Sequence, residues 1–213
     1  MKTCHILLSC LMAIISNVAY AQSMDSVLVR VPQSELPLLE RNPRLDMLDL
    51  FNSNMEAKAE NAFGGNSYLL EKDKNHLFIR LTDVSDWEVQ RLTLQEDTIF
   101  ACIHTVRTPA AGSTIRYYTG NWEPDTSYQT IAPEFSAFWQ AGNDSLSAAR
   151  KEELQRIARH CPISIRWEKE SGQAALSFQV STAALAIEDQ EDIKKCLRNI
   201  TGPAEQFIRK RTK

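Results

Sequence analysis

Glycine is scarce in this chain, with 7 residues among 213, and the sequence contains no Gly-rich loop of the kind that cradles nucleotides. Positive charge is not in excess either, since the formal net charge is −3. Nucleic acids are bound chiefly through a positive field, so this balance argues against a nucleic-acid partner. The motifs Gly-x-Ser-x-Gly, Ser-x-x-Lys, Cys-x-x-Cys and His-Glu-x-x-His are also absent. We therefore expect no cofactor and favour a protein that is not an enzyme.

Cysteine is scarce as well, with 5 residues, and two of them, Cys4 and Cys10, lie close to the N-terminus. The other three are Cys102, Cys161 and Cys196. An odd, small number of cysteines is not typical of a disulfide framework. We expect buried thiols, with at most one disulfide among these three.

One long apolar run occurs in the sequence, from Ile6 to Val18. Lys2 precedes this run, and the small-x-small sequence Ala19-Tyr20-Ala21 follows it. This order is typical of a secretory signal peptide. We therefore predict that residues 1–21 are a cleaved signal peptide.

The mature chain, residues 22–213, is predicted to form a single domain in the periplasm or outside the cell. Cys10 lies inside the apolar run rather than at its end, which argues against lipoprotein anchoring at this cysteine. No second run of this length follows, so we expect no transmembrane segment in the mature chain.

The N-terminal part of the mature chain predicts a short strand at Met24–Val31 and then a helix. Pro43 is predicted to open that helix, in the N1-like position that proline favours. Apolar residues follow three or four positions apart: Leu45, Leu48, Phe51, Met55 and Ala59. We expect Gly64-Gly65 to end the helix.

After Gly65 the apolar period changes from 3.6 to 2, which indicates strands. The expected strands are residues 77–81, 87–94, 99–106 and 114–122, and turn-forming residues separate them. Short strands with short connections are typical of an antiparallel meander. The alternation changes phase within 87–94, and we expect a bulge near Gln90-Arg91.

Two further strands form the clearest pattern in the chain. With a two-residue turn at Ser171-Gly172, every apolar residue of one strand faces an apolar residue of the other. The predicted pairs are Ile163 with Val180, Ile165 with Phe178, and Trp167 with Leu176. The other face of this hairpin is polar.

Helices are predicted on both sides of this hairpin, one ending before Pro162 and one beginning at Glu188. Thr201-Gly202-Pro203 is expected to stop the last helix, and the basic tail from Arg209 is expected to be frayed. The predicted fold class is α+β, an antiparallel meander sheet of about six to eight strands with about three helices packed on one face. The pattern leaves open whether the strands form one sheet or two.

The segment Asn42-Pro43-Arg44-Leu45-Asp46-Met47-Leu48-Asp49-Leu50-Phe51, followed by Asn61-Ala62-Phe63-Gly64-Gly65-Asn66-Ser67, resembles the N-terminal signature of a known family. The family is "domain of unknown function 3256", a set of exported proteins of the Bacteroidetes. The resemblance implies an exported protein of that lineage. It implies no activity, cofactor or catalytic residue.

Aromatic residues gather between Tyr117 and Trp139, a segment that ends in a long irregular stretch. Exposed aromatics on such a stretch suit a protein, lipid or glycan partner, whereas buried ones cover the core. The candidate ligand-binding residues are Trp122, Tyr128 and Trp139. The partner itself is not identified by the sequence.

Three functions remain open. The first is a non-catalytic binding or accessory protein of the cell envelope. The second is a hydrolase of an envelope or dietary polymer, with carboxylates that only the fold brings together. The third is a metal site at Cys102 and His104, which share a strand face and could be joined by His160 and Cys161. Because the metal-ligand spacings are absent, we assign no metal-binding and no catalytic residue.

Overall fold

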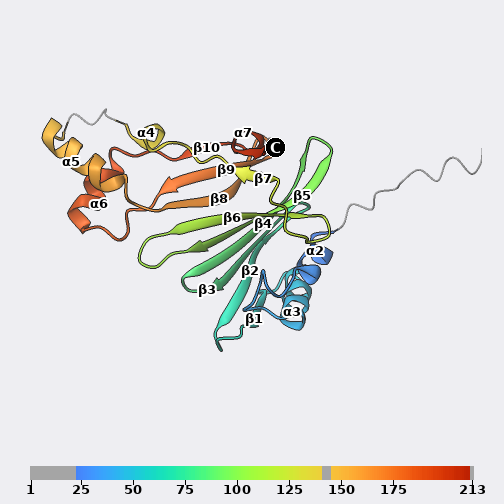
Figure 1. The fold of residues 1–213 in the computed structure, drawn as a ribbon. Helices are drawn as coiled ribbons and strands as arrows, with labels where there is room; N and C mark the ends of the chain where they lie inside the picture. The colour runs from blue at the N-terminus through green and yellow to red at the C-terminus, as the bar shows by residue number, and fades with distance from the viewer. Residues whose placement is uncertain (1–22, 141–144, 212–213) are drawn as a thin grey trace, which may run out of the picture.

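Six antiparallel strands form the central sheet, and each strand pairs with its neighbours in chain order (Figure 1). They are β1 (Lys58–Glu60), β2 (Asn66–Lys72), β3 (His76–Thr82), β4 (Ser85–Leu94), β5 (Asp97–Val106) and β6 (Gly112–Thr119). The computed structural model describes residues 23–140 and 145–211, so the predicted signal peptide lies outside the described residues. The predicted α+β class and the antiparallel meander are confirmed.

Strand β4 pairs with β5 along its whole length without a shift in register. The bulge predicted near Gln90-Arg91 is therefore wrong. The change of phase has another cause, because Trp87 and Val89 enter one hydrophobic core while Leu92 and Leu94 enter another on the opposite face. A sheet that is covered on both faces accepts apolar residues in either phase.

Helix α2 (Met24–Arg30) covers one face of the sheet, where the sequence predicts a short strand. That prediction is wrong. The Ser23 side chain caps the helix by accepting a hydrogen bond from the Ser26 N–H at 3.3 Å. The buried side chains of α2 lie three and four residues apart, as a helix requires: Met24, Val27 and Leu28.

Helix α3 (Arg41–Asn52) lies beside α2 on the same face, and it begins two residues before Pro43, the predicted first residue. It ends earlier than expected, because Asn54 turns the chain with a φ of 54°. Gly64-Gly65 lies in the loop between β1 and β2 and does not end a helix. The buried Arg44 guanidinium joins both helices by donating to the carbonyls of Leu28, Val31 and Leu39.

A second antiparallel sheet packs against the opposite face of the central sheet. It consists of β8 (Ile163–Glu170), β9 (Gln173–Val180) and β10 (Ile200–Pro203). The predicted register of the hairpin is confirmed at all three pairs, Ile163 with Val180, Ile165 with Phe178, and Trp167 with Leu176. Ser171 and Gly172 form the turn with φ values of 50° and 81°.

The remaining elements surround this second sheet. They are β7 (Tyr128–Thr130), α4 (Phe135–Phe138), α5 (Ala148–Ala158), α6 (Ile187–Lys194), α7 (Ala204–Phe207) and β11 (Ile208–Lys210). Thr201-Gly202-Pro203 belongs to β10 and is not a helix stop, and β11 pairs with β7 where a frayed tail was predicted. Both predictions are wrong because tertiary pairing overrides the local signals. None of the described helices is long and apolar enough to cross a membrane.

Candidate binding groove

The face of the central sheet that meets the second sheet changes from apolar to polar along β4. Leu92 and Leu94 belong to the core between the sheets, but the next residues in the same phase are Gln90, Glu88 and Asp86. His76 on β3 and Thr105 on β5 extend this polar area, and all five polar residues are buried. We call His76, Asp86, Glu88, Gln90 and Thr105 the polar band. Several polar and charged residues buried together are more informative than exposed ones, because each must be compensated.

Two adjoining cavities open beside the polar band. The first, which we call the arginine pocket, has a volume of about 500 Å³ and is lined by Phe78, Arg80, Asp86, Glu88, Thr105, Arg107, Ala111, Ser164 and Arg166. The second, the acidic pocket, has about 370 Å³ and is lined by Glu71, Asp73, His76, Gln90, Arg166, Trp167, Glu168 and Lys169. Arg166 lines both and lies between them, 3.8 Å from Glu88 in the first and 3.6 Å from Glu71 in the second, and we call the two pockets together the polar groove. Their volumes suit a small ligand.

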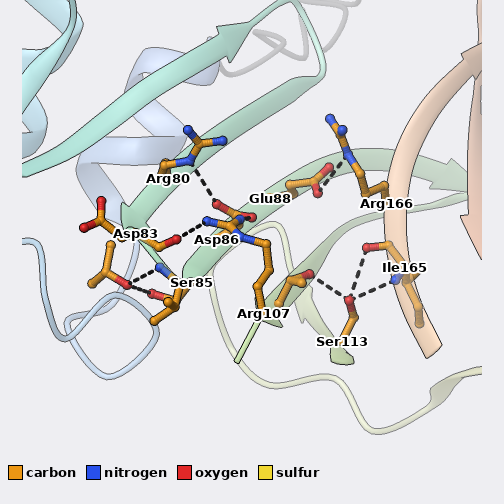
Figure 2. A network of polar contacts seen from close by, with 12 residues as sticks. Arg80, Asp83, Ser85, Asp86, Glu88, Arg107, Ser113, Ile165 and Arg166 are labelled. Atoms are coloured by element: carbon orange, nitrogen blue, oxygen red, sulfur yellow. Dashed lines mark hydrogen bonds and ion pairs between the residues drawn. The ribbon is translucent and has the colours of Figure 1, made fainter. Parts of the chain in front are cut away.

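The wall of this groove is the outer edge of β8, an edge strand of its sheet. Edge strands carry backbone groups without strand partners, and two side chains of the central sheet compensate them here. Glu88 accepts a hydrogen bond from the Trp167 N–H at 3.1 Å. Ser113 accepts one from the Ile165 N–H at 2.8 Å, and Figure 2 shows this contact between Ser113 and Ile165. The edge of β8 is therefore fixed in place.

Three arginines surround the two carboxylates of the arginine pocket. Figure 2 shows Arg80 and Arg107 converging on Asp86, while Arg166 reaches from β8 towards Glu88. Arg107 forms an ion pair with Asp86, and Arg80 Nε lies 3.7 Å from Asp86 Oδ1. Burial lowers the pKa of Arg107, and the positive charge of Arg80 lowers it further. With the shared Arg166 counted here, three guanidinium groups meet two carboxylates, and positive charge is in excess in this pocket.

Hydrogen bonding in the groove is incomplete. Across the described ranges 23–140 and 145–211, four buried side-chain polar atoms lack a hydrogen-bond partner, and three belong to residues that line the groove: His76 Nε2, Asp86 Oδ1 and Trp167 Nε1. His76 and Asp86 are only 6% and 7% exposed. His76 Nε2 lies 3.5 Å from Glu88 Oε2 but lacks the geometry of a hydrogen bond. Such atoms are uncommon inside proteins and mark places where a ligand can contribute.

A second polar cluster lies on the helical face of the central sheet, around the buried Glu35. Its carboxylate accepts hydrogen bonds from Trp87 Nε1 at 3.2 Å and from the Tyr118 hydroxyl, and His104 Nε2 lies 2.7 Å from Oε1. Arg116 lies 3.6 Å from Oε2. Burial alone would raise the pKa of Glu35, but the hydrogen bonds from His104 and Tyr118 outweigh it, and the pKa is lowered. This cluster joins the segment before α3 to the sheet.

The three aromatic residues predicted from the sequence do not meet. Trp122 is buried on the helical face, where its ring stacks on Phe100 at 4.8 Å. Tyr128 is buried in the core between the sheets and donates to Asp97 at 2.9 Å. Trp139 packs in a third cluster with α5 and α6 and is partly exposed. The structure assigns these residues to three hydrophobic clusters, and their binding of a ligand stays a prediction.

Cys102 and His104 share one face of β5 as predicted, but His104 is engaged with Glu35. Cys102 is buried, which together with the charge of Glu35 raises the pKa of its thiol. All three cysteines of the described residues are free. Within the same residues, no group of three or more His, Cys, Asp or Glu side chains is arranged to hold a metal ion.

The polar groove was not predicted from the sequence, although β4 carries a signal for it. Asp86, Glu88 and Gln90 alternate with Trp87 and Val89 in a strand that lies in the middle of the meander. In a sheet with one solvated face this alternation is ordinary. It becomes informative only when a second sheet is known to cover the polar face, and no local pattern predicts that packing.

The fold and the groove define an α+β protein in which two antiparallel sheets enclose a charged cleft. The family described as "Protein of unknown function (DUF3256)" matches residues 16–201, and the chain belongs to this family. A solved structure, described as a domain of an uncharacterized protein from Porphyromonas gingivalis W83, is similar with a TM-score of 0.65 and 18% identity. The match covers 89% of this chain and 98% of that one, and it supports the fold alone. A comparison with curated proteins gives no match.

Proposed function

We propose that this protein is a non-catalytic binding protein of the cell envelope and that the polar groove is its ligand-binding site. The observation that carries the proposal is the incomplete hydrogen bonding of His76 and Asp86, which are buried where they line the groove. A ligand with donors and acceptors would supply the missing partners. Leaving buried polar atoms unpaired costs about 1–3 kcal/mol each, so their pairing favours binding.

The arrangement of the carboxylates favours binding over hydrolysis. A hydrolase of the kind considered above needs one carboxyl group that gives a proton and one that attacks or activates water. Asp86 is ion-paired with Arg107, and Glu88 holds the edge of β8 through the Trp167 N–H. One oxygen of each of these two carboxylates is therefore engaged within the protein, Asp86 Oδ2 by Arg107 and Glu88 Oε2 by the Trp167 N–H.

The envelope location rests on the signal-peptide pattern at residues 1–21. The intact mass of the protein recovered from outside the cytoplasm tests it. A mass that begins at Gln22 supports export and cleavage. A mass that retains residues 1–21, or a lipid on Cys10, contradicts it.

Amide NMR spectra of isotope-labelled protein test the binding site itself. Three ligand classes are added in turn: short peptides, neutral and acidic oligosaccharides, and lipid vesicles. We expect one class to shift the amide signals of β3, β4 and β8, and Arg107→Gln to weaken this response. Arg156→Gln, which makes the same change on exposed α5, is the matched control. Shifts confined to residues 117–139, or no shifts with any class, contradict the proposal.

A further inference from the structure

The two ends of the polar groove carry opposite charge. The arginine pocket brings three guanidinium groups against two carboxylates. With the shared Arg166 counted in the arginine pocket, the acidic pocket brings three carboxylates against Lys169. A ligand that matches both pockets has an anionic group at one end and a cationic group at the other.

The anionic end suits a carboxylate. Guanidinium groups bind carboxylates through two parallel hydrogen bonds, a geometry that lysine cannot offer. The side chains of Arg80 and Arg107 are 44% and 30% exposed, so both remain accessible beside Asp86. Arg166 reaches the same pocket from β8 and lies over the Phe78 ring at 5.0 Å.

The cationic end suits an ammonium group. Glu71, Asp73 and Glu168 supply its acceptors, two from β2 and its following turn and one from β8. Lys169 contacts Asp73 at 2.5 Å, and Arg166 lies 3.6 Å from Glu71, so neither carboxylate lacks a cation. An ammonium group here would add to an existing network rather than complete an empty site.

The length of the groove limits the size of the ligand. Arg80 in the arginine pocket and His76 in the acidic pocket lie four positions apart on β3. At about 3.3 Å per residue this separation is about 13 Å. An extended peptide of about three or four residues spans the same distance between its two ends.

Between the two ends, buried side-chain atoms of the groove lining lack a hydrogen-bond partner. Asp86 Oδ1 lies 3.7 Å from Arg80 Nε without a hydrogen bond, so it retains the capacity to accept one from a peptide N–H. His76 Nε2 is the second such atom, with Gln90 beside it in the same pocket. An oligosaccharide also offers donors and acceptors, but a uronic acid chain carries no cationic end.

We propose that the polar groove binds short peptides, about three or four residues long, through both of their charged ends. The α-carboxylate lies among Arg80, Arg107 and Arg166, and the α-ammonium group lies in the acidic pocket. This inference rests on the proposed function and specifies its ligand class.

Equilibrium dialysis with a pool of tetrapeptides of randomised side chains tests it. The pool is used with free ends, with acetylated N-termini and with amidated C-termini. We expect the free pool to bind and each blocked pool to bind at least tenfold more weakly. Arg107→Gln is expected to reproduce the loss seen on amidation, while Arg156→Gln leaves binding unchanged. Thermal unfolding confirms that both variants are folded.

The outcomes separate the inference from the function on which it rests. If trigalacturonate binds, is lost in Arg107→Gln, and the free tetrapeptides do not bind, the peptide inference is overturned and the binding groove stands. If the blocked and free pools bind equally well, recognition of the ends is overturned. If neither peptide nor trigalacturonate binds, and Arg107→Gln has no effect on any ligand, both proposals fail.

Discussion

Two polar clusters lie on opposite faces of the same central sheet, and they differ in how completely they are paired. On the helical face, Glu35 is surrounded by donors from Trp87, His104 and Tyr118. On the other face, Asp86 and His76 keep buried atoms without a hydrogen-bond partner. A fully paired buried network stabilises a fold, whereas a partly paired one is costly until something completes it. The difference assigns a structural role to the first cluster and a binding role to the second.

The largest loss of stability is expected when the hydrogen bonds of the Glu35 cluster are removed. Glu35→Ala leaves the Trp87 and Tyr118 donors buried without an acceptor and removes the partner of His104. We expect the free energy of unfolding to fall by about 3 kcal/mol. Urea denaturation measures it, with Glu40→Ala as the control on an exposed carboxylate in the same loop. If the free energy of unfolding of Glu35→Ala falls no further than that of Glu40→Ala, the cluster does not stabilise the fold.

Glu88 in the groove resembles Glu35, because it also stabilises the fold through a buried hydrogen bond. Glu88→Ala removes the acceptor of the Trp167 N–H and leaves the edge of β8 uncompensated. We expect a loss of about 2 kcal/mol, and Glu88→Gln, which keeps an acceptor oxygen, should recover most of it. Urea denaturation of the two variants makes the comparison. Equal stabilities would show that Glu88 does not hold β8 through this hydrogen bond.

Acid pH tests the Glu35 cluster in a different way, through the ionisation of its carboxyl group. The pKa of Glu35 is lowered in the folded protein from its ordinary value of 4.5. Its contribution to stability is therefore complete above that value and is lost as the pH falls through the lower pKa of the folded state. We expect the stability of the wild type to fall more steeply than that of Glu35→Gln between about pH 5 and pH 3. Parallel pH profiles of the two proteins, measured by urea denaturation, would contradict this expectation.

The sequence predicts what depends on neighbouring residues and misses what depends on distant ones. The hairpin of β8 and β9 was predicted to its register, because apolar alternation and a Ser-Gly turn specify it locally. The strand predicted at helix α2 is wrong. The adjacent residues Val27, Leu28 and Val29 favour a β-strand locally, whereas the segment packs against the sheet as a helix.

Neither polar cluster could be predicted in this way. Glu35 meets Trp87, His104 and Tyr118 across 52 to 83 positions of the chain. The groove depends on β8 packing against the polar residues of β4. Glu88 and Trp167, which join the two strands by a hydrogen bond, are 79 positions apart in the chain. Contacts at this separation depend on how the two sheets pack, and periodicity within a strand carries no information about that packing.

The smallest change in stability, and the sharpest test of the comparison, comes from Asp86→Asn. The amide keeps an acceptor oxygen but removes the charge that Arg80 and Arg107 share, and both arginines can still be hydrated. We expect a loss of about 1 kcal/mol at most, because ion pairs with exposed partners contribute little.

The excess of positive charge in the arginine pocket grows at the same time. Acetate, used as a minimal carboxylate, should therefore raise the melting temperature of Asp86→Asn more than that of the wild type. Sodium chloride at the same ionic strength is the control for screening. If acetate and chloride act alike on both proteins, the arginine pocket does not select carboxylates, and the contrast between the paired Glu35 cluster and the incompletely paired groove loses its chemical basis.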